Sequence, residues 1–245
     1  MIVWVASYPR SGNRMSRSTL RQAYGIKLIG SAASDEALRR DLGDLLDELG
    51  AAPGEDPLPP LREYDKPVFL KTHSVPEQVH TLPEVKEQRP EEEERSPALY
   101  LVRDGRDCLV SYAHYMRRYN KRFAEKSFEE ALYDLIWRPN PYGGWAGNVG
   151  GWRRRTAPVA FVHFEDMLED SVAALGEGAA KLGLELGEPV REAPTFEQAQ
   201  ERSRKPELLR RGKAGSWRSE FPPDLMDEFW KHHGEEMERA GYERG

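Results

Sequence analysis

The N-terminal segment constrains the fold of this chain more than any other stretch. Residues 2–6 are apolar and largely β-branched, which predicts a short buried strand. Pro9 and Gly12 then interrupt this run, and a helical pattern follows at once. A strand that leads through a turn of small residues into a helix is typical of a phosphate-binding loop, because free backbone N–H groups and the positive end of the helix dipole converge there. Arg10 and Arg14 add fixed positive charge, so the segment predicts a site for a nucleotide phosphate.

The remainder of the chain alternates between apolar runs and helical patterns. Strands are expected at 67–73, 98–102 and 158–164. Helices are expected at 14–24, 34–50, 108–119, 127–136, 165–184, 195–205 and 222–240, and Ser127 with Glu130 predicts a capping box. The glycine-rich segment 142–151 follows no strand and lacks the spacing of a dinucleotide-binding fingerprint, so we predict a loop there.

This alternation predicts an α/β fold. We expect a three-layer sandwich with a central, mainly parallel sheet and helices on both faces, in a P-loop-like nucleotide-binding topology. A chain of 245 residues is long enough for one sizeable core, and we expect residues 1–245 to form a single domain.

The composition narrows the possible partners. Since 36 basic residues stand against 42 acidic ones, the net charge is −6, and no overall positive charge favours nucleic acid or anionic membranes. Cys108 is the only cysteine, which excludes disulfide scaffolds and cysteine-rich zinc sites, and we expect it to be buried in a helix. The sequence has no apolar run of the roughly 18 residues that a membrane span needs. It also has no leader pattern, so the expected location is cytoplasmic.

Two further segments carry residues suited to anions. Between the predicted strand 98–102 and the next helix, Arg103 and Ser111 can together hold a phosphate, because a guanidinium fork grips two oxygens and a serine hydroxyl adds a short donor. The segment 210–217 combines three cations with glycines whose backbone can approach a ligand closely. A Walker A motif is missing from the sequence, which counts against a nucleoside-triphosphate kinase.

Taken together, these segments resemble the motifs of the sulfotransferases that use 3′-phosphoadenosine-5′-phosphosulfate (PAPS). Residues 8–15, Tyr-Pro-Arg-Ser-Gly-Asn-Arg-Met, are similar to the family's Tyr-Pro-Lys-Ser-Gly-Thr-Thr-Trp loop, and 103–111 and 210–217 match its two later motifs in order. The resemblance implies a bacterial-type small-molecule or natural-product sulfotransferase. It also implies that Arg10, Ser11, Gly12, Asn13 and Arg14 contact the 5′-phosphosulfate of PAPS, that Arg103 and Ser111 contact its 3′-phosphate, and that Met15, Phe164 and Phe196 lie beside the adenine. The third motif adds Arg210, Arg211 and Gly212 to the residues expected to bind PAPS.

The same resemblance assigns the catalytic residues. The run Lys71-Thr-His73 falls where the family has its catalytic Lys-Thr-His, at the end of a predicted strand. A neutral imidazole can take a proton from an acceptor hydroxyl near neutral pH, which favours His73 as the base. Lys71 would neutralise the transferring sulfonate and Arg10 would offset charge on the leaving phosphate. The implied reaction moves a sulfuryl group from PAPS to a hydroxyl or amine and requires no metal.

Departures from the family pattern leave alternatives open. Arg10 replaces a lysine and cannot readily donate its proton, while Arg14 and Met15 replace a hydroxyl residue and an aromatic one. These changes motivate a second hypothesis, a non-catalytic module that binds adenosine 3′,5′-bisphosphate (PAP); a nucleotide kinase is a weaker third. The acceptor is not predicted beyond a hint from aromatic residues that it carries a ring or is apolar: Tyr115, Tyr119, Trp137, Tyr142 and Trp145. The oligomeric state is not predicted either.

Overall fold

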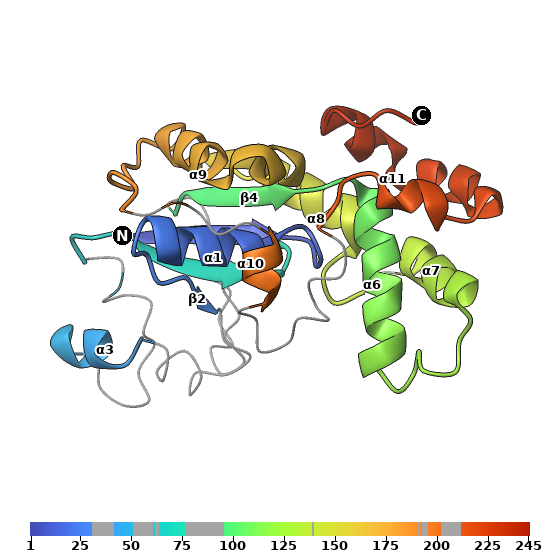
Figure 1. Ribbon diagram of the computed structural model, residues 1–245, viewed down its shortest axis with the longest axis horizontal. Coiled ribbons are helices and arrows are strands. Elements are labelled where there is room, and N and C mark those ends of the chain that lie inside the picture. Colours follow the sequence, from blue (N-terminus) through green and yellow to red (C-terminus); the bar gives the residue numbers. More distant parts are fainter. Residues whose placement is uncertain are drawn as a thin grey trace.

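The described part of the chain forms one five-stranded parallel sheet with helices packed on both faces (Figure 1). The computed structural model describes residues 1–30, 42–50, 61, 64–76, 96–138, 140–190, 192, 196–201 and 212–245. The strands are β1 (Ile2–Ser7), β2 (Ile29–Gly30), β3 (Val68–Thr72), β4 (Ala98–Val102) and β5 (Val159–His163). The helices are α1 (Asn13–Ala23), α3 (Asp44–Glu48), α6 (Gly105–Tyr119), α7 (Phe128–Trp137), α8 (Gly144–Arg153), α9 (Phe164–Ala180), α10 (Phe196–Glu201) and α11 (Met226–Arg239), with 3-10 turns η3 (Ser216–Ser219) and η4 (Pro223–Leu225). The predicted α/β class is confirmed.

The order of the strands places β1 at the centre of the sheet. The order is β2-β3-β1-β4-β5, and every pairing is parallel. Ala6 lies opposite Thr72 on one side and Tyr100 on the other. Because all strands run in one direction, the segments that follow them emerge at the same edge of the sheet, where ligands bind in open α/β folds.

Alternating side chains of the central strand pack against two different layers of helices. Val3 and Val5 belong to the apolar cluster that α1 and α9 complete, whereas Trp4 and Ala6 belong to the cluster that α6, α7, α8 and α11 complete. All four side chains are almost fully buried. The β-branched and aromatic composition of β1 therefore suits a strand covered on both faces.

Several elements form where the local sequence pattern predicts them. The strand at 98–102 has the predicted bounds, and α1 ends next to Gly25, whose φ of 67° suits a glycine after a helix. Ser127 accepts a hydrogen bond from the backbone N–H of Glu130, and the Glu130 carboxylate accepts one from the N–H of Ser127, so the capping box is confirmed. Cys108 is buried in α6, as expected.

The prediction of a loop at 142–151 is wrong, because α8 occupies most of it. Trp145, Val149 and Trp152 are completely buried on one side of this helix. Tertiary burial of two tryptophans outweighs the poor helix propensity of the glycines.

The glycines of α8 instead permit close packing. A Cβ on Gly150 would lie 3.0 Å from a carboxylate oxygen of Glu236 in α11, and one on Gly151 would lie 3.1 Å from Pro76. The helix can therefore approach both α11 and the segment after β3 closely.

Some predicted elements fall partly outside the described residues. Of the helix expected at 34–50, the structure describes residues 42–50, in which Leu42 and Leu46 are buried. Residues 202–211 lie outside the description, so α10 covers only part of the helix expected at 195–205. No helix within the described ranges is long and apolar enough to cross a bilayer.

Candidate active site

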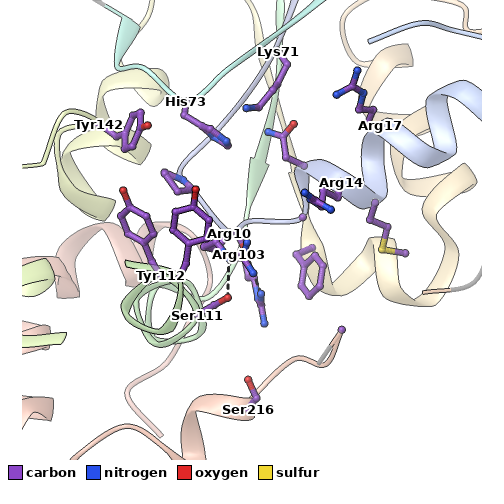
Figure 2. Close-up of a pocket in the computed structure, with 17 residues that line it drawn as sticks. Arg10, Arg14, Arg17, Lys71, His73, Arg103, Ser111, Tyr112, Tyr142 and Ser216 are labelled. Atoms are coloured by element: carbon purple, nitrogen blue, oxygen red, sulfur yellow. Dashed lines mark hydrogen bonds between the residues drawn. The ribbon is translucent and has the colours of Figure 1, made fainter. Parts of the chain in front are cut away.

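A cavity of about 430 Å³ lies at the ends of β1, β3 and β4. The starts of α1 and α9, the middle of α6 and the segment before η3 complete its walls. It is lined by Pro9, Arg10, Gly12, Asn13, Arg14, Met15, Arg17, Lys71, His73, Arg103, Ser111, Tyr112, Tyr115, Tyr142, Phe164, Gly212 and Ser216. Figure 2 shows Lys71 and His73 at one end of the cavity, Ser216 at the opposite end, and Arg10 and Arg14 between them. The parallel sheet thus brings together residues that are far apart in the sequence.

The loop between β1 and α1 has a backbone conformation that few types of amino acid adopt. Gly12 precedes α1 with a φ of 99°, and a Cβ there would lie 2.6 Å from the Phe164 ring. Arg10 has a φ of 76° and is the only described residue other than glycine with a positive φ. A side-chain-bearing residue held in this region costs about 1–3 kcal/mol, and such strain is concentrated at functional sites. The first backbone N–H groups of α1 open toward this loop and suit an anion.

The cavity is strongly positive. Five cationic side chains line it, those of Arg10, Arg14, Arg17, Lys71 and Arg103, and no aspartate or glutamate is among the described lining residues. Burial, together with Arg17 and Arg14, lowers the pKa of Lys71 to about 8. Burial, together with Arg103 and Arg14, lowers the pKa of Arg10 to about 10. The cations therefore repel one another, and an anion in the cavity would relieve that repulsion.

Arg10, Ser111 and Arg103 form a connected group beside the loop. Arg10 Nε donates a hydrogen bond to Ser111 Oγ at 2.9 Å, shown dashed in Figure 2. Arg103 Nη1 donates to the backbone carbonyl oxygen of Arg10 at 3.1 Å. The Nε atom of Arg103 is buried and has no hydrogen-bond partner among the residues that the structure describes. A buried guanidinium N–H of this kind is costly unless a ligand accepts from it, which fits an anionic group here.

The opposite wall of the cavity comes from the segment after residue 211, and a single carboxylate fixes it. Asp107 accepts hydrogen bonds from Gly215 N at 2.8 Å, Ser216 Oγ at 2.8 Å and Trp217 N at 2.9 Å. Its side chain is fully buried and lies 3.4 Å from Arg103 Nη2. Asp107 therefore ties the segment carrying Ser216 to the start of α6.

The imidazole of His73 is held in one orientation. Its Nδ1 lies 2.8 Å from the backbone carbonyl oxygen of Ser7 and 3.2 Å from Ser7 Oγ, which in turn accepts from Asn13 Nδ2 at 2.7 Å. A carbonyl oxygen can only accept, so Nδ1 carries the proton and Nε2 keeps its lone pair. Burial, with Lys71 and Arg10 nearby, lowers the pKa of His73 to about 3. The ring is therefore neutral near neutral pH, with an unprotonated Nε2.

Three tyrosines form the side of the cavity next to His73. The Tyr142 and His73 rings meet edge-to-face with centroids 5.9 Å apart, and the Tyr112 and Tyr115 rings stack at 6.1 Å. Burial raises the pKa values of Tyr112 and Tyr142, so both hydroxyls stay protonated and can donate hydrogen bonds. This side of the cavity suits an acceptor with a ring and at least one polar group.

Most of the predicted site residues lie at this one cavity. Ser11 is buried beneath the loop, where its hydroxyl lies 3.3 Å from Cys108 Sγ. Phe164 lines the cavity below the guanidinium of Arg103, with its ring centre 4.3 Å from the guanidinium carbon. Arg210, Arg211 and the side chain of Phe196 lie outside what the structure describes.

The sequence interpretation missed Arg17, Tyr112 and Ser216. Arg17 lies one helical turn after Arg14, and Tyr112 follows Ser111 in α6, so helical spacing could have placed both at the cavity. Within the described ranges, no three His, Cys, Asp or Glu side chains gather as a metal site.

Comparison with known proteins identifies the family. The model of the sulfotransferase domain matches residues 2–241. Mouse sulfotransferase 1E1 is 27% identical over 197 residues, covering 72% of this chain and 64% of the relative, so the chain spans just under two-thirds of that relative. Human sulfotransferase 4A1 is 25% identical over 235 residues, covering 93% of this chain and 77% of the relative.

Solved structures share the fold. Mouse sulfotransferase SULT7A1 complexed with PAP superposes with a TM-score of 0.64 at 18% identity, covering 98% of this chain and 85% of that one. Retinol dehydratase in complex with androsterone and inactive cofactor PAP gives a TM-score of 0.54 at 20% identity, covering 96% and 80%. Because the family match spans almost every residue and includes each element that builds the cavity, the chain belongs to the sulfotransferase family.

Proposed function

We propose that this protein transfers a sulfuryl group from PAPS to a hydroxyl or amine of a small-molecule acceptor and releases PAP. One observation carries the proposal: a cavity lined by five cations, without a described carboxylate, adjoins a neutral histidine whose Nε2 is available as a base. Family membership supports the same reaction. Since the cavity joins elements from both ends of the chain, we also propose that residues 1–245 act as one domain.

The residues present fit PAPS. Arg10, Gly12, Asn13 and Arg14 would hold its 5′ end, because the loop offers backbone N–H groups and two guanidinium groups. Arg103 and Ser111 would hold the 3′-phosphate, and the unpartnered Nε of Arg103 supports this assignment. Gly212 also lines the cavity, and Arg210 and Arg211, which precede it in the sequence, stay predicted ligands of PAPS. Met15 and Phe164 offer an apolar surface for the adenine, and a role for Phe196 there stays a prediction.

PAPS supplies the sulfuryl group and the leaving phosphate, and the protein positions the groups and neutralises charge. As a bond forms from the acceptor oxygen or nitrogen to sulfur and the bond from sulfur to the phosphate oxygen breaks, His73 Nε2 takes the acceptor proton. Ser7 supports this step because its carbonyl keeps the other ring nitrogen protonated. Lys71 would neutralise the sulfonate oxygens, and Arg10 would offset charge on the leaving phosphate.

The tyrosine-lined side of the cavity would receive the acceptor. Tyr112, Tyr115 and Tyr142 give ring surfaces and hydroxyl groups close to His73. Retinol dehydratase, which shares the fold, is in complex with androsterone in one solved structure and with retinol in another. A natural-product acceptor and a cytoplasmic location stay predictions from the sequence.

The test is transfer of labelled sulfate from PAPS to a panel of alcohols, phenols, sugars and amines. We expect product with at least one acceptor. His73→Ala should lower kcat by about 10²–10⁴-fold, the contribution typical of a positioned base, while PAP still binds. Binding of PAP without turnover of any acceptor, or a His73→Ala variant as active as the wild-type protein, would contradict the proposal.

A further inference from the structure

A fully buried side-chain amide connects α8 to the strand end that carries His73. Asn148 has no exposed surface. Its Nδ2 donates hydrogen bonds to the backbone carbonyl oxygen of His73 at 2.9 Å and to that of Tyr142 at 2.8 Å. Its Oδ1 accepts from Tyr100 Oη at 2.8 Å. Both carbonyls can only accept, so the orientation of the amide is fixed and both of its N–H groups are used.

A second side chain of α8 holds the next residue. Trp152 lies one helical turn after Asn148, and its Nε1 donates to the backbone carbonyl oxygen of Ser74 at 3.0 Å. Two successive carbonyls after β3 are therefore bound by the same helix. On the other side, the Ser7 carbonyl holds the imidazole ring. His73 is thus fixed through its ring by β1 and through its backbone by α8.

The same amide also fixes the wall of the cavity next to the base. The Tyr142 ring faces the ring of His73, and both side chains point into the cavity (Figure 2). Asn140 adds to this arrangement, because its Oδ1 accepts from Tyr142 N at 2.9 Å and its Nδ2 donates to Tyr8 Oη at 2.8 Å. The spacing between the base and the tyrosine therefore depends on Asn148, which bonds to both backbones.

We propose that Asn148 is a positioning residue that holds His73 and Tyr142 against each other, so that the base and the tyrosine ring together line the position of the acceptor. The proposal rests on the function proposed above, in which His73 is the base. Asn148 is fully buried and is not among the residues that line the cavity, so it would contact neither PAPS nor the acceptor. Its effect is therefore expected on the use of the acceptor and not on the binding of the nucleotide.

The most informative variant is Asn148→Asp, which keeps the shape of the side chain. It replaces Nδ2, which donates to two carbonyl oxygens, with an oxygen that cannot donate to either. A displacement of about 1 Å at a reacting group can cost roughly 10²-fold in rate. We expect kcat to fall by about that factor and the acceptor KM to rise. The dissociation constant of PAP should change less than about threefold, because Asn148 touches none of the cations of the cavity.

Tyr100→Phe is the matched control. It removes the hydrogen bond to Oδ1 of the same buried amide and leaves both Nδ2 bonds in place. We expect a smaller loss of thermal stability than in Asn148→Asp, because only one hydrogen bond is removed, with kcat and acceptor KM within about threefold of the wild-type values. Equal kinetic losses in Asn148→Asp and Tyr100→Phe would overturn the proposal, because they would indicate general loosening of the core.

Two further measurements keep the test decisive. Trp152→Phe keeps an aromatic ring, although a smaller one, and removes the bond from Nε1 to the Ser74 carbonyl. If Asn148→Asp does not fold, this variant should lower kcat by about tenfold, and unchanged kcat and KM would overturn the proposal. Nitrogen NMR of the His73 ring reports the tautomer without turnover: we expect protonated Nδ1 in the wild-type protein and a mixture of tautomers in Asn148→Asp or, in its place, Trp152→Phe. If no acceptor is sulfated, the proposed function fails, and unchanged ring signals in the variant would separately overturn the positioning role.

Discussion

Replacing Asp107 with asparagine is expected to loosen the wall of the cavity that carries Gly212 and Ser216. The new side chain keeps Oδ1, which accepts from Ser216 Oγ and Trp217 N. It loses Oδ2, which accepts from Gly215 N and faces Arg103. The amide N–H₂ that replaces this oxygen is a donor and faces two other donors. A hydrogen bond to a buried charge contributes about 1.5–3 kcal/mol, and removing one partner of a buried ion pair costs about 3–5 kcal/mol. We therefore expect a loss of roughly 3 kcal/mol.

This loss should be visible in both unfolding and binding. For a chain of this size, about 3 kcal/mol corresponds to a fall of roughly 6–12 °C in the thermal midpoint. Because Asp107 also holds Arg103 toward the predicted 3′-phosphate position, the affinity for PAP should fall by at least about tenfold, or 1.4 kcal/mol. Differential scanning fluorimetry and isothermal titration calorimetry measure the two effects, with the exposed Asp224→Asn as the charge-matched control. A midpoint and a PAP affinity equal to those of the control would refute the reasoning.

Three further predictions follow from single residues. Gly12→Ala should abolish detectable PAP binding in calorimetry and lower the thermal midpoint, because a Cβ there would lie 2.6 Å from Phe164 at a φ of 99°; a variant that binds PAP normally would contradict this. Burial lowers the pKa of His233 to about 3, so between pH 6.5 and 3 the unfolded chain binds a proton that the folded protein does not, and the free energy of unfolding should fall as the pH drops. In urea unfolding, His233→Leu should reduce this pH dependence by about 1.4 kcal/mol per pH unit, and an unchanged pH dependence would contradict the prediction. Ser127→Ala should lower the free energy of unfolding in urea by about 1 kcal/mol through loss of the capping box. A loss no larger than that of the exposed control Ser219→Ala would show that the cap contributes little.

Features that depend on a few neighbouring residues were predictable. The apolar run that became β4, the Ser127 and Glu130 cap, and the turn around Gly12 each follow from local propensity and hydrogen bonding. The parallel sheet then brings Lys71, His73 and Arg103 to one edge, so the positive end of the cavity follows from the strand order. Locating the base within that cavity required the family resemblance.

Features that depend on long-range packing were not predictable. The glycines of α8 favour a loop locally, and only burial of Trp145 and Trp152 explains the helix. For the same reason, the hydrogen bond from Asn148 to the His73 backbone could not be predicted from local patterns. Asp107 lies within the motif 103–111, but its structural role could not be predicted, because its three bonds reach residues more than a hundred positions away.

The claim that this cavity is a PAPS site is tested most directly by the thermal midpoint of the protein with PAP, AMP and ATP at equal concentration. A ligand at about 100 times its dissociation constant stabilises the native state by about 2.7 kcal/mol, which corresponds to roughly 5–11 °C for this chain. We predict a shift of that size with PAP and a much smaller one with AMP, which lacks the 3′-phosphate that Arg103 and Ser111 would bind. A shift with ATP and Mg²⁺ that equals or exceeds the shift with PAP would contradict the account.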